Sequence, residues 1–191
     1  MTNSFSLPLL ALNFKILHRL ILAILIALPI SLTGFTSSAT AEDCLNFNPD
    51  DISVKKANGR WKIVEGSSHW MFDFNNNRVE ARKSLAVIKH YGLNKSCFVG
   101  RPNPAFQYLL KDNSLPVGPT NGEDCVTFNP ATITVSLIQN RWKIVDGNHW
   151  VFDFNTNQAE AKQSFEIIQK YQATHSCYVG RPNPSFVYLR R

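Results

Sequence analysis

The sequence predicts an α+β protein built from two tandem small modules of the order βββαββ, each an antiparallel sheet with one helix packed on one face. Three observations predict this fold: an internal duplication, a change in the spacing of apolar residues within each copy, and one pair of cysteines per copy. Residues 42–109 and 123–189 align with a single one-residue gap, and more than half of the aligned positions are identical. Because a duplication sets the architecture, the chain divides into repeat 1 (42–110), a linker (111–122) and repeat 2 (123–191).

Residues 1–41 have the pattern of a secretory signal peptide. They contain no Asp or Glu, and a basic stretch around Lys15 and Arg19 precedes an apolar run from Leu20 to Leu32. A stretch of small residues ending at Ala41 then supplies an A-x-A cleavage site. The apolar run is shorter than the roughly 20 residues of a membrane span. We therefore expect cleavage after Ala41 and a secreted or periplasmic protein, with an uncleaved N-terminal anchor as the alternative.

The charge of the remaining chain excludes one class of partner. Without Lys15 and Arg19, the formal net charge falls from +6 to +4. This mild excess permits attraction to anionic surfaces, but it does not indicate nucleic acid, and no nucleic-acid-binding motif is present in the sequence. No second apolar run follows residue 41. We therefore expect no membrane span after signal cleavage.

Repeat 1 begins with three predicted strands joined by short turns. Apolar and polar residues alternate in the segments 52–55, 60–63 and 69–74. The dipeptide Asn58-Gly59 separates the first two segments and is typical of a tight hairpin turn. An apolar period of two with short turns predicts an antiparallel meander with one buried face.

A helix follows the meander in each repeat. Asn77, with Glu80 three residues later, resembles a capping box, and Asn157 with Glu160 repeats the pattern. Apolar residues then recur at positions i, i+4 and i+7, which predicts one amphipathic helix per repeat. In repeat 1 this helix is expected to end near Gly92.

Two further strands and a linker complete the predicted organisation. The segments 97–99 and 105–109 are short and apolar, and the sequence G-R-P-N-P between them predicts a stiff turn. The segment 111–122 has no copy elsewhere in the chain and is rich in Pro, Gly, Ser and Asn. Its two prolines predict a linker that is partly extended rather than fully flexible.

The four cysteines of the chain lie at matched places in the two repeats. An even count in an exported protein predicts disulfides, and two per repeat favour the pairs Cys44–Cys97 and Cys125–Cys177. Cross-repeat pairing is the alternative, and it would make each copy depend on the other. With one bridge inside each repeat, we expect each repeat to fold alone. We expect neither a metal nor another cofactor, because no close C-x-x-C pair is present.

Alternation along the strands places a set of polar residues on the sheet face opposite the helix. The set is identical in both repeats and could hold sugar hydroxyls or an anionic group: Arg60, Lys62, His69 and Asp73 in repeat 1, and Arg141, Lys143, His149 and Asp153 in repeat 2. The competing interpretation is structural. In that case Lys62 forms a cross-strand ion pair with Asp73, and His69 bonds the adjacent turn.

The G-R-P-N-P turns are the second candidate binding feature. Their two prolines fix the backbone and would present Arg101 with Asn103, and Arg181 with Asn183, in a rigid arrangement. The alternative is a purely structural turn in which the Asn bonds its own backbone. The four tryptophans are in phase with apolar neighbours, so we expect them in the core rather than at a sugar-binding surface.

No catalytic site is predicted. An imidazole and a carboxylate such as His69 and Asp73 can do acid–base chemistry. However, no Ser or Cys nucleophile is matched beside them, and Glu80 is better explained as a helix cap. The sequence therefore favours a binding protein over an enzyme.

The leading hypothesis is a secreted or periplasmic, non-catalytic tandem-repeat binding protein. Its expected partner is a cell-surface polysaccharide or another anionic or polyhydroxyl target, for which two linked copies raise avidity. The main alternative is an extracytoplasmic protein-interaction module, such as an inhibitor or an assembly subunit. A third hypothesis is a small hydrolase that uses His69 and Asp73.

Overall fold

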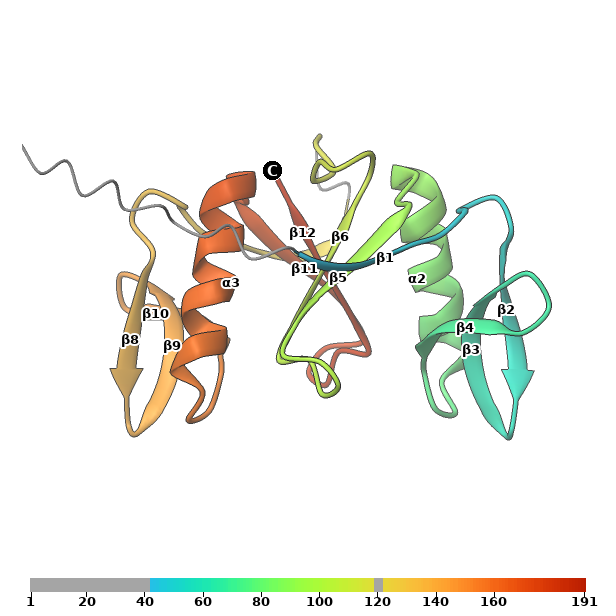
Figure 1. Cartoon of the computed structure of the whole chain (residues 1–191), viewed down its shortest axis with the longest axis horizontal. Helices are drawn as coiled ribbons and strands as arrows, with labels where there is room; N and C mark the ends of the chain where they lie inside the picture. The colour runs from blue at the N-terminus through green and yellow to red at the C-terminus, as the bar shows by residue number, and fades with distance from the viewer. Residues whose placement is uncertain (1–41, 119–121) are drawn as a thin grey trace, which may run out of the picture. The chain divides into compact units, whose positions relative to one another are not determined.

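The computed structural model describes residues 42–118 and 122–191 (Figure 1). The predicted signal peptide, 1–41, lies outside the described residues. Each repeat contains six strands and one helix. In repeat 1 these are β1 (Asp43–Asn46), β2 (Ile52–Ala57), β3 (Arg60–Glu65), β4 (His69–Asp73), α2 (Arg78–Tyr91), β5 (Lys95–Val99) and β6 (Phe106–Leu110). In repeat 2 they are β7 (Asp124–Thr127), β8 (Thr134–Ile138), β9 (Arg141–Asp146), β10 (His149–Asp153), α3 (Gln158–Tyr171), β11 (His175–Val179) and β12 (Phe186–Arg190).

The strands form four three-stranded antiparallel sheets, in the orders β2-β3-β4, β1-β5-β6, β10-β9-β8 and β12-β11-β7. Helices and antiparallel sheets thus combine as the α+β prediction expected. The arrangement differs from one sheet per repeat because each repeat has an additional first strand. That strand, β1 or β7, pairs with the strand that follows the helix instead of extending the meander.

The helix caps follow the local sequence. The Asn77 side chain accepts a hydrogen bond of 3.1 Å from the backbone N–H of Glu80, and the Asn157 side chain accepts one of 3.2 Å from Glu160. Gly92 ends α2 with a positive φ of 60°, as the predicted end of this helix requires. Side-chain oxygens thus satisfy a backbone donor at the start of each helix that has no partner within the helix.

The predicted disulfides are confirmed. Cys44 bonds to Cys97, and Cys125 bonds to Cys177. In each repeat the two cysteines are direct partners in the register between the first strand and the strand after the helix. The bridges therefore fix the pairing of β1 with β5 and of β7 with β11.

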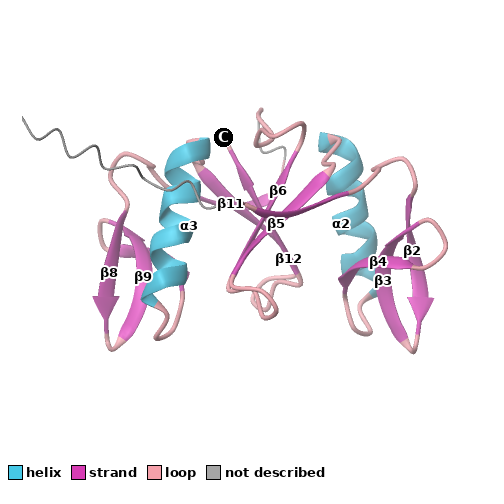
Figure 2. Cartoon of the chain, in the orientation of Figure 1, coloured by secondary structure: helices cyan, strands magenta, loops and turns pink. Residues whose placement is uncertain are grey.

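The hydrophobic cores are shared between the repeats. Figure 2 shows β5, β6, β11 and β12 between α2 and α3. In the core around α2, residues of repeat 1 such as Ile63 and Ile88 pack with Val179, Phe186 and Tyr188 of repeat 2.

The core around α3 has the converse composition. Here Val99, Phe106 and Tyr108 of repeat 1 pack with residues of repeat 2 such as Ile144 and Ile168. Each helix therefore covers strands of the opposite repeat as well as its own meander. This differs from the expectation that each repeat folds alone, because neither repeat contains a complete core.

The predicted linker is packed at residues 115 and 116, which are buried, whereas its other described residues are exposed. Leu115 is buried, and the backbone N–H of Arg191 donates to the carbonyl of Pro116 over 3.0 Å. The Arg190 side chain donates to the carbonyl of Gly118 over 2.5 Å. These contacts tie residues 116–118 of the linker to the end of repeat 2. In the described part of the chain, no helix has both the length and the apolarity needed to cross a membrane.

Candidate functional site

A bulge between β3 and β4 changes which aromatic side chain faces solvent. Ile63 pairs with Phe72 and Val64 pairs with Trp70, so Met71 is an extra residue without a partner in the register. The bulge turns Met71 toward the core, where it packs, and moves Trp70 to the face that carries Asp73. The side chain of Trp70 is 57% exposed, so its predicted place in the core is wrong.

Repeat 2 repeats this geometry. Its β9–β10 register also shifts, with Val151 as the extra residue. Val151 is buried, and Trp150 is 61% exposed. Trp61 and Trp142, which precede the bulges, do pack against the cores as predicted. A one-residue shift thus separates the tryptophans into one half-buried and one exposed residue per repeat.

The exposed tryptophan of repeat 1 belongs to a charged cluster, which we call the repeat-1 cluster: Arg60, Lys62, Trp70 and Asp73. The Arg60 Nε donates to the Asp73 carboxylate over 2.9 Å, and the Lys62 Nζ lies 3.5 Å from the same carboxylate. The Lys62 ammonium also lies 4.4 Å from the centroid of the Trp70 ring, within cation–π range. One carboxylate thus holds two cations beside an exposed indole.

The repeat-2 cluster, formed by Arg141, Lys143, Trp150 and Asp153, has matching geometry. The Arg141 Nε donates to the Asp153 carboxylate over 2.8 Å, and the Lys143 Nζ lies 3.6 Å from it. The Lys143 ammonium lies 5.0 Å from the centroid of the Trp150 ring. In each repeat the structure therefore brings together three of the four residues predicted for the polar face and adds a tryptophan.

Both cluster carboxylates stay ionised at neutral pH. Burial alone would raise the pKa of Asp73, but hydrogen bonds from the Asn75 backbone and Arg60, with the charges of Arg60 and Lys62, lower it below its usual value of 3.8. The pKa of Asp153 is lowered in the same way. Each carboxylate is therefore a permanent acceptor in its cluster.

The histidines lie apart from these carboxylates. The Nδ1 of His69 is 3.1 Å from the Glu65 carboxylate, which lies directly opposite it in the β3–β4 register. His149 is opposite Asp146 in the same way. The predicted contact of His69 with its turn is thus present, whereas Asp73 bonds Arg60 and Lys62. His69 and Asp73 thus have different partners in the described structure.

The arginines of the G-R-P-N-P turns form ion pairs within their own repeats. Arg101 donates two hydrogen bonds to the Asp43 carboxylate, and the Arg181 Nε donates to Asp124 over 2.7 Å. Each guanidinium also lies over a ring of the preceding strand. These residues hold the turn against the first strand of the repeat.

The same turns border the clusters of the opposite repeat. Asn183 and Pro184 of repeat 2 line a hollow together with Asp73 and the start of α2. Asn103 is exposed, and Pro104 beside it lines a groove of about 660 Å³. Other residues of that groove come from both repeats and include Phe106, Trp150, Asp153, Arg181 and Phe186. The candidate sites are therefore composite, which prediction from each repeat alone did not anticipate.

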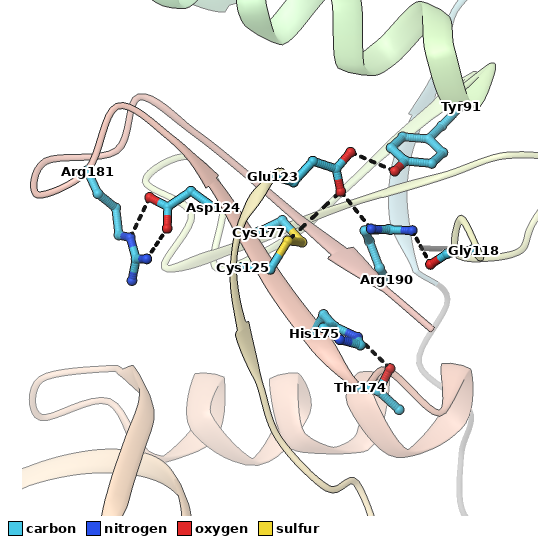
Figure 3. Close-up of a disulfide and its surroundings, with 10 residues drawn as sticks. All are labelled: Tyr91, Gly118, Glu123, Asp124, Cys125, Thr174, His175, Cys177, Arg181 and Arg190. Atoms are coloured by element: carbon cyan, nitrogen blue, oxygen red, sulfur yellow. Dashed lines mark hydrogen bonds and ion pairs between the residues drawn. A yellow bond between two sulfur atoms is a disulfide. The ribbon is translucent and has the colours of Figure 1, made fainter. Parts of the chain in front are cut away.

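A pair of cross-repeat polar contacts was also missed from the sequence. The hydroxyl of Tyr91, on α2, donates to Glu123 over 2.6 Å, and the Arg190 Nη1 donates to the same carboxylate over 2.6 Å (Figure 3). Burial and the bond to Glu123 raise the pKa of Tyr91 to about 12. The tyrosine therefore remains a hydrogen-bond donor throughout the neutral range.

The second contact is formed around Glu42. The hydroxyl of Tyr171, on α3, donates to Glu42 over 2.8 Å, and the Lys170 Nζ donates to it over 2.6 Å. Burial would raise the pKa of Glu42, but the bonds from Lys170 and Tyr171 lower it overall. The only signal in the sequence was the presence of the same Glu and Tyr in both repeats, which does not reveal that they bond across them.

Two groups of potential metal ligands surround the disulfides: Glu42 with Cys44 and Cys97, and Glu123 with Cys125 and Cys177. Metal binding by cysteine requires a thiolate. Here both sulfurs of each group are joined to one another, so neither group is a metal site. No protein-family model, no curated protein and no solved structure matches this chain.

Proposed function

We propose that this protein binds polysaccharide outside the cytoplasm through the repeat-1 and repeat-2 clusters. The observation that carries the proposal is the pair of bulges, each of which turns a tryptophan out of the core and places it beside a carboxylate with two cations. Exposing an indole forgoes its burial in the core, which would favour the folded state by roughly 2–3 kcal/mol. A ligand that covers the indole offsets this loss.

The chemistry of each cluster suits a polyhydroxyl ligand. The flat indole offers an apolar face to the C–H groups of a sugar ring, and its N–H is a donor. The ionised carboxylate accepts hydrogen bonds from sugar hydroxyls, while Arg and Lys donate to hydroxyl oxygens or to anionic substituents. Each cluster is bordered by the G-R-P-N-P turn of the opposite repeat. The prolines of this turn stiffen it, which lowers the entropic cost of binding.

The compartment and the duplication support the same proposal. Two disulfides and no free cysteine in the described residues fit an oxidising, extracytoplasmic environment. The sequence of 1–41 agrees with export. Two related clusters on one chain can engage neighbouring units of a repetitive polymer, so that the second contact becomes intramolecular and avidity rises.

The test is binding of the disulfide-intact protein to a glycan array and to purified cell-wall material. Trp70→Ala and Trp150→Ala should each weaken binding by about thirtyfold, the equivalent of ~2 kcal/mol, and the double variant should abolish it. Leu137→Ala is the matched control, because Leu137 is also an exposed apolar strand residue, at 56%, outside both clusters. Unchanged binding by the double variant would refute the proposal.

A protein partner is the second candidate, and the groove of about 660 Å³ favours it. Its wall combines aromatic residues, including Phe106 and Phe186, with prolines of both turns. Aromatic walls of this kind suit an extended peptide segment. Pull-down from the extracytoplasmic fraction separates the two functions: a stoichiometric protein partner supports this candidate, and elution by a saccharide supports the first.

A further inference from the structure

The two helices differ in charge although their buried faces match. With histidine neutral, α2 carries four cationic residues and one carboxylate, which gives a formal charge of +3. The helix α3 carries two cationic residues and two carboxylates, which gives a formal charge of zero. Both helices start from an Asn cap, and each buries an alanine at the same position, Ala81 or Ala161. The difference in charge therefore belongs to the outer surface of α2 rather than to its packing.

Three of the α2 cations lie in one line along the helix. With about 100° of rotation per residue, Arg78, Arg82 and Lys89 fall within roughly 40° of one another around the axis. With a rise of about 1.5 Å per residue, they span roughly 16 Å along the helix. All three side chains are exposed. The line of charge therefore runs over most of the length of α2 and faces solvent.

A fourth cation extends this line onto the neighbouring sheet. Lys56 is exposed and lies directly opposite Trp61 in the β2–β3 register, so the two side chains project from the same sheet face. The Arg78 guanidinium lies over the Trp61 ring, 4.7 Å from its centroid, and this contact orients it. We call this set of residues the repeat-1 basic stripe: Lys56, Arg78, Arg82 and Lys89.

The repeat-1 basic stripe has no carboxylate partner in residues 42–118 and 122–191. None of its four side chains lies within ion-pair distance of an Asp or Glu there. By contrast, Arg60, Lys62 and Arg101 of the same repeat are each paired with a carboxylate. The stripe is therefore a concentration of positive charge that the described part of the protein does not neutralise.

Repeat 2 does not reproduce the stripe. Opposite Trp142, at the place of Lys56, it has Leu137. On α3, Lys162 is followed four residues later by Glu166, which is close enough to offset its charge. The remaining two positions of the stripe are occupied by uncharged residues, Gln158 and Gln169. The duplication thus supplies an internal comparison, in which the folds match and the stripe is confined to one copy.

The stripe begins beside the repeat-1 cluster. Arg78 lines the same hollow as Asp73 of that cluster and Asn183 of the opposite repeat. The carboxylate of this first helical turn, Glu80, is directed toward Gly180, where an added Cβ would meet it. A polymer held at the repeat-1 cluster therefore lies next to the first cation of the stripe and can continue along α2.

We propose that the polysaccharide bound by this protein is acidic, and that the repeat-1 basic stripe binds its anionic substituents. The inference deepens the proposed function and rests on it, because it names the class of polysaccharide. A linear row of cations matches the linear row of anions on such a polymer. Arg and Lys donate charge-assisted hydrogen bonds to carboxylate, phosphate or sulfate groups.

An anionic membrane matches this surface less well. A helix that binds at a membrane interface inserts an exposed apolar face among the lipids. The apolar face of α2 instead packs in the protein core, where Ala81 and Ile88 are buried. The surface of α2 therefore offers charge without an apolar face to insert, which favours a hydrated polyanion.

The test compares two forms of one polymer, using the full chain with its disulfides intact. Polygalacturonate and its methyl ester share one sugar backbone, but only the first is anionic. Calorimetric titration at low ionic strength should show at least about tenfold tighter binding of the acidic form. Added salt should reduce this difference, because it screens exposed charges. Equal affinities would overturn the inference and leave the polysaccharide proposal standing. Binding of neither polymer would also overturn it, whereas the glycan array decides the proposed function separately.

Substitutions test whether the stripe itself is responsible. Lys56→Gln, Arg82→Gln and Lys89→Gln are combined, and Arg78 is kept because it also borders the repeat-1 cluster. This variant should lose about tenfold in affinity for polygalacturonate and bind the methyl ester as before. The control variant removes three exposed cations elsewhere and so changes the net charge equally: Lys83→Gln, Lys162→Gln and Arg191→Gln. An equal loss in both variants would show that net charge attracts the polymer, and the inference would fail.

A gain of binding guards against a loss caused by misfolding. Leu137→Lys with Gln158→Arg gives repeat 2 two cations of the stripe and should raise the affinity for polygalacturonate by about threefold. Unchanged affinity in this variant would contradict the role of the stripe. Vesicles of phosphatidylglycerol are the last comparison. If they bind more tightly than polygalacturonate and lose binding in the stripe variant, the stripe is a membrane contact and the inference is overturned.

Discussion

Replacing Phe186 with alanine tests whether the repeats share one core. Phe186 belongs to repeat 2 and is 3% exposed, and its ring centroid lies 5.3 Å from that of Phe72 in repeat 1. The aromatic side chain buries on the order of 150–250 Å². At about 25 cal/mol per Å², that burial contributes roughly 4–6 kcal/mol, part of which alanine retains. Including the cavity left behind, Phe186→Ala should cost about 3–5 kcal/mol.

The expected loss is large against a total stability of about 5–15 kcal/mol, and it should lower Tm by on the order of 10 °C. The informative assay is amide hydrogen exchange, read separately on α2 and α3. Because Phe186 completes the core around α2, protection should fall on the helix of the unsubstituted repeat. Leu137→Ala, exposed in the same repeat as Phe186, should change stability by less than about 0.5 kcal/mol. Loss of protection confined to repeat 2 would refute the shared core.

Tyr91→Phe removes the hydrogen bond to a partly buried carboxylate of the opposite repeat and should cost about 1.5–3 kcal/mol in urea unfolding. Asp73 and Asp153 have lowered pKa values in the folded protein, so their carboxylates stabilise the fold at a pH above the unfolded pKa of about 3.8. This contribution is lost as the pH falls through their folded pKa values. Asp73→Asn with Asp153→Asn should therefore flatten the dependence of the urea midpoint on pH below about 4. Removing the Cys44–Cys97 bridge, which closes a 53-residue separation, should cost about 4 kcal/mol and destabilise both repeats together.

Each of these predictions has a direct control. Tyr178→Phe keeps a ring that packs beside Arg181 in its own repeat, so it should leave the urea midpoint unchanged, and an equal effect of both tyrosine substitutions would contradict the cross-repeat bond. An unaltered acid transition in the double Asn variant would contradict the carboxylate assignment. Two separate unfolding transitions without the bridge would show that the repeats unfold independently.

Local features of the fold were predictable because they depend on a few neighbouring residues. The Asn77 cap and the end of α2 at Gly92 follow from backbone preferences near each position. The disulfide pairs followed from the matched placement of cysteines in the two copies. Each of these signals is complete within one repeat.

The exposed tryptophans were missed because a bulge leaves little trace in an alternating pattern. One extra residue, Met71, reverses the phase of the strand before it, so Trp70 moves from the inner to the outer face. Both Met71 and Trp70 are apolar, so the sequence is compatible with either phase. The register with β3 decides between them, and that depends on pairing rather than on composition.

The exchange of core residues between the repeats was missed for a different reason. An amphipathic helix shows which face it buries but not what covers that face. The two copies carry nearly the same apolar residues, so the strands of either repeat satisfy α2 equally well by composition. The positions at which the copies differ, such as Leu110 and Arg190, are too few to reveal the exchange from the sequence.

The shared cores have a consequence for synthesis on the ribosome. The core around α2 needs Phe186, which emerges 77 residues after Leu109, the last residue that repeat 1 itself adds to that core. At about 5–20 residues per second, the nascent first repeat waits on the order of ten seconds for its missing strand. During that interval the apolar surface around α2 has no partner strands and is open to chaperones.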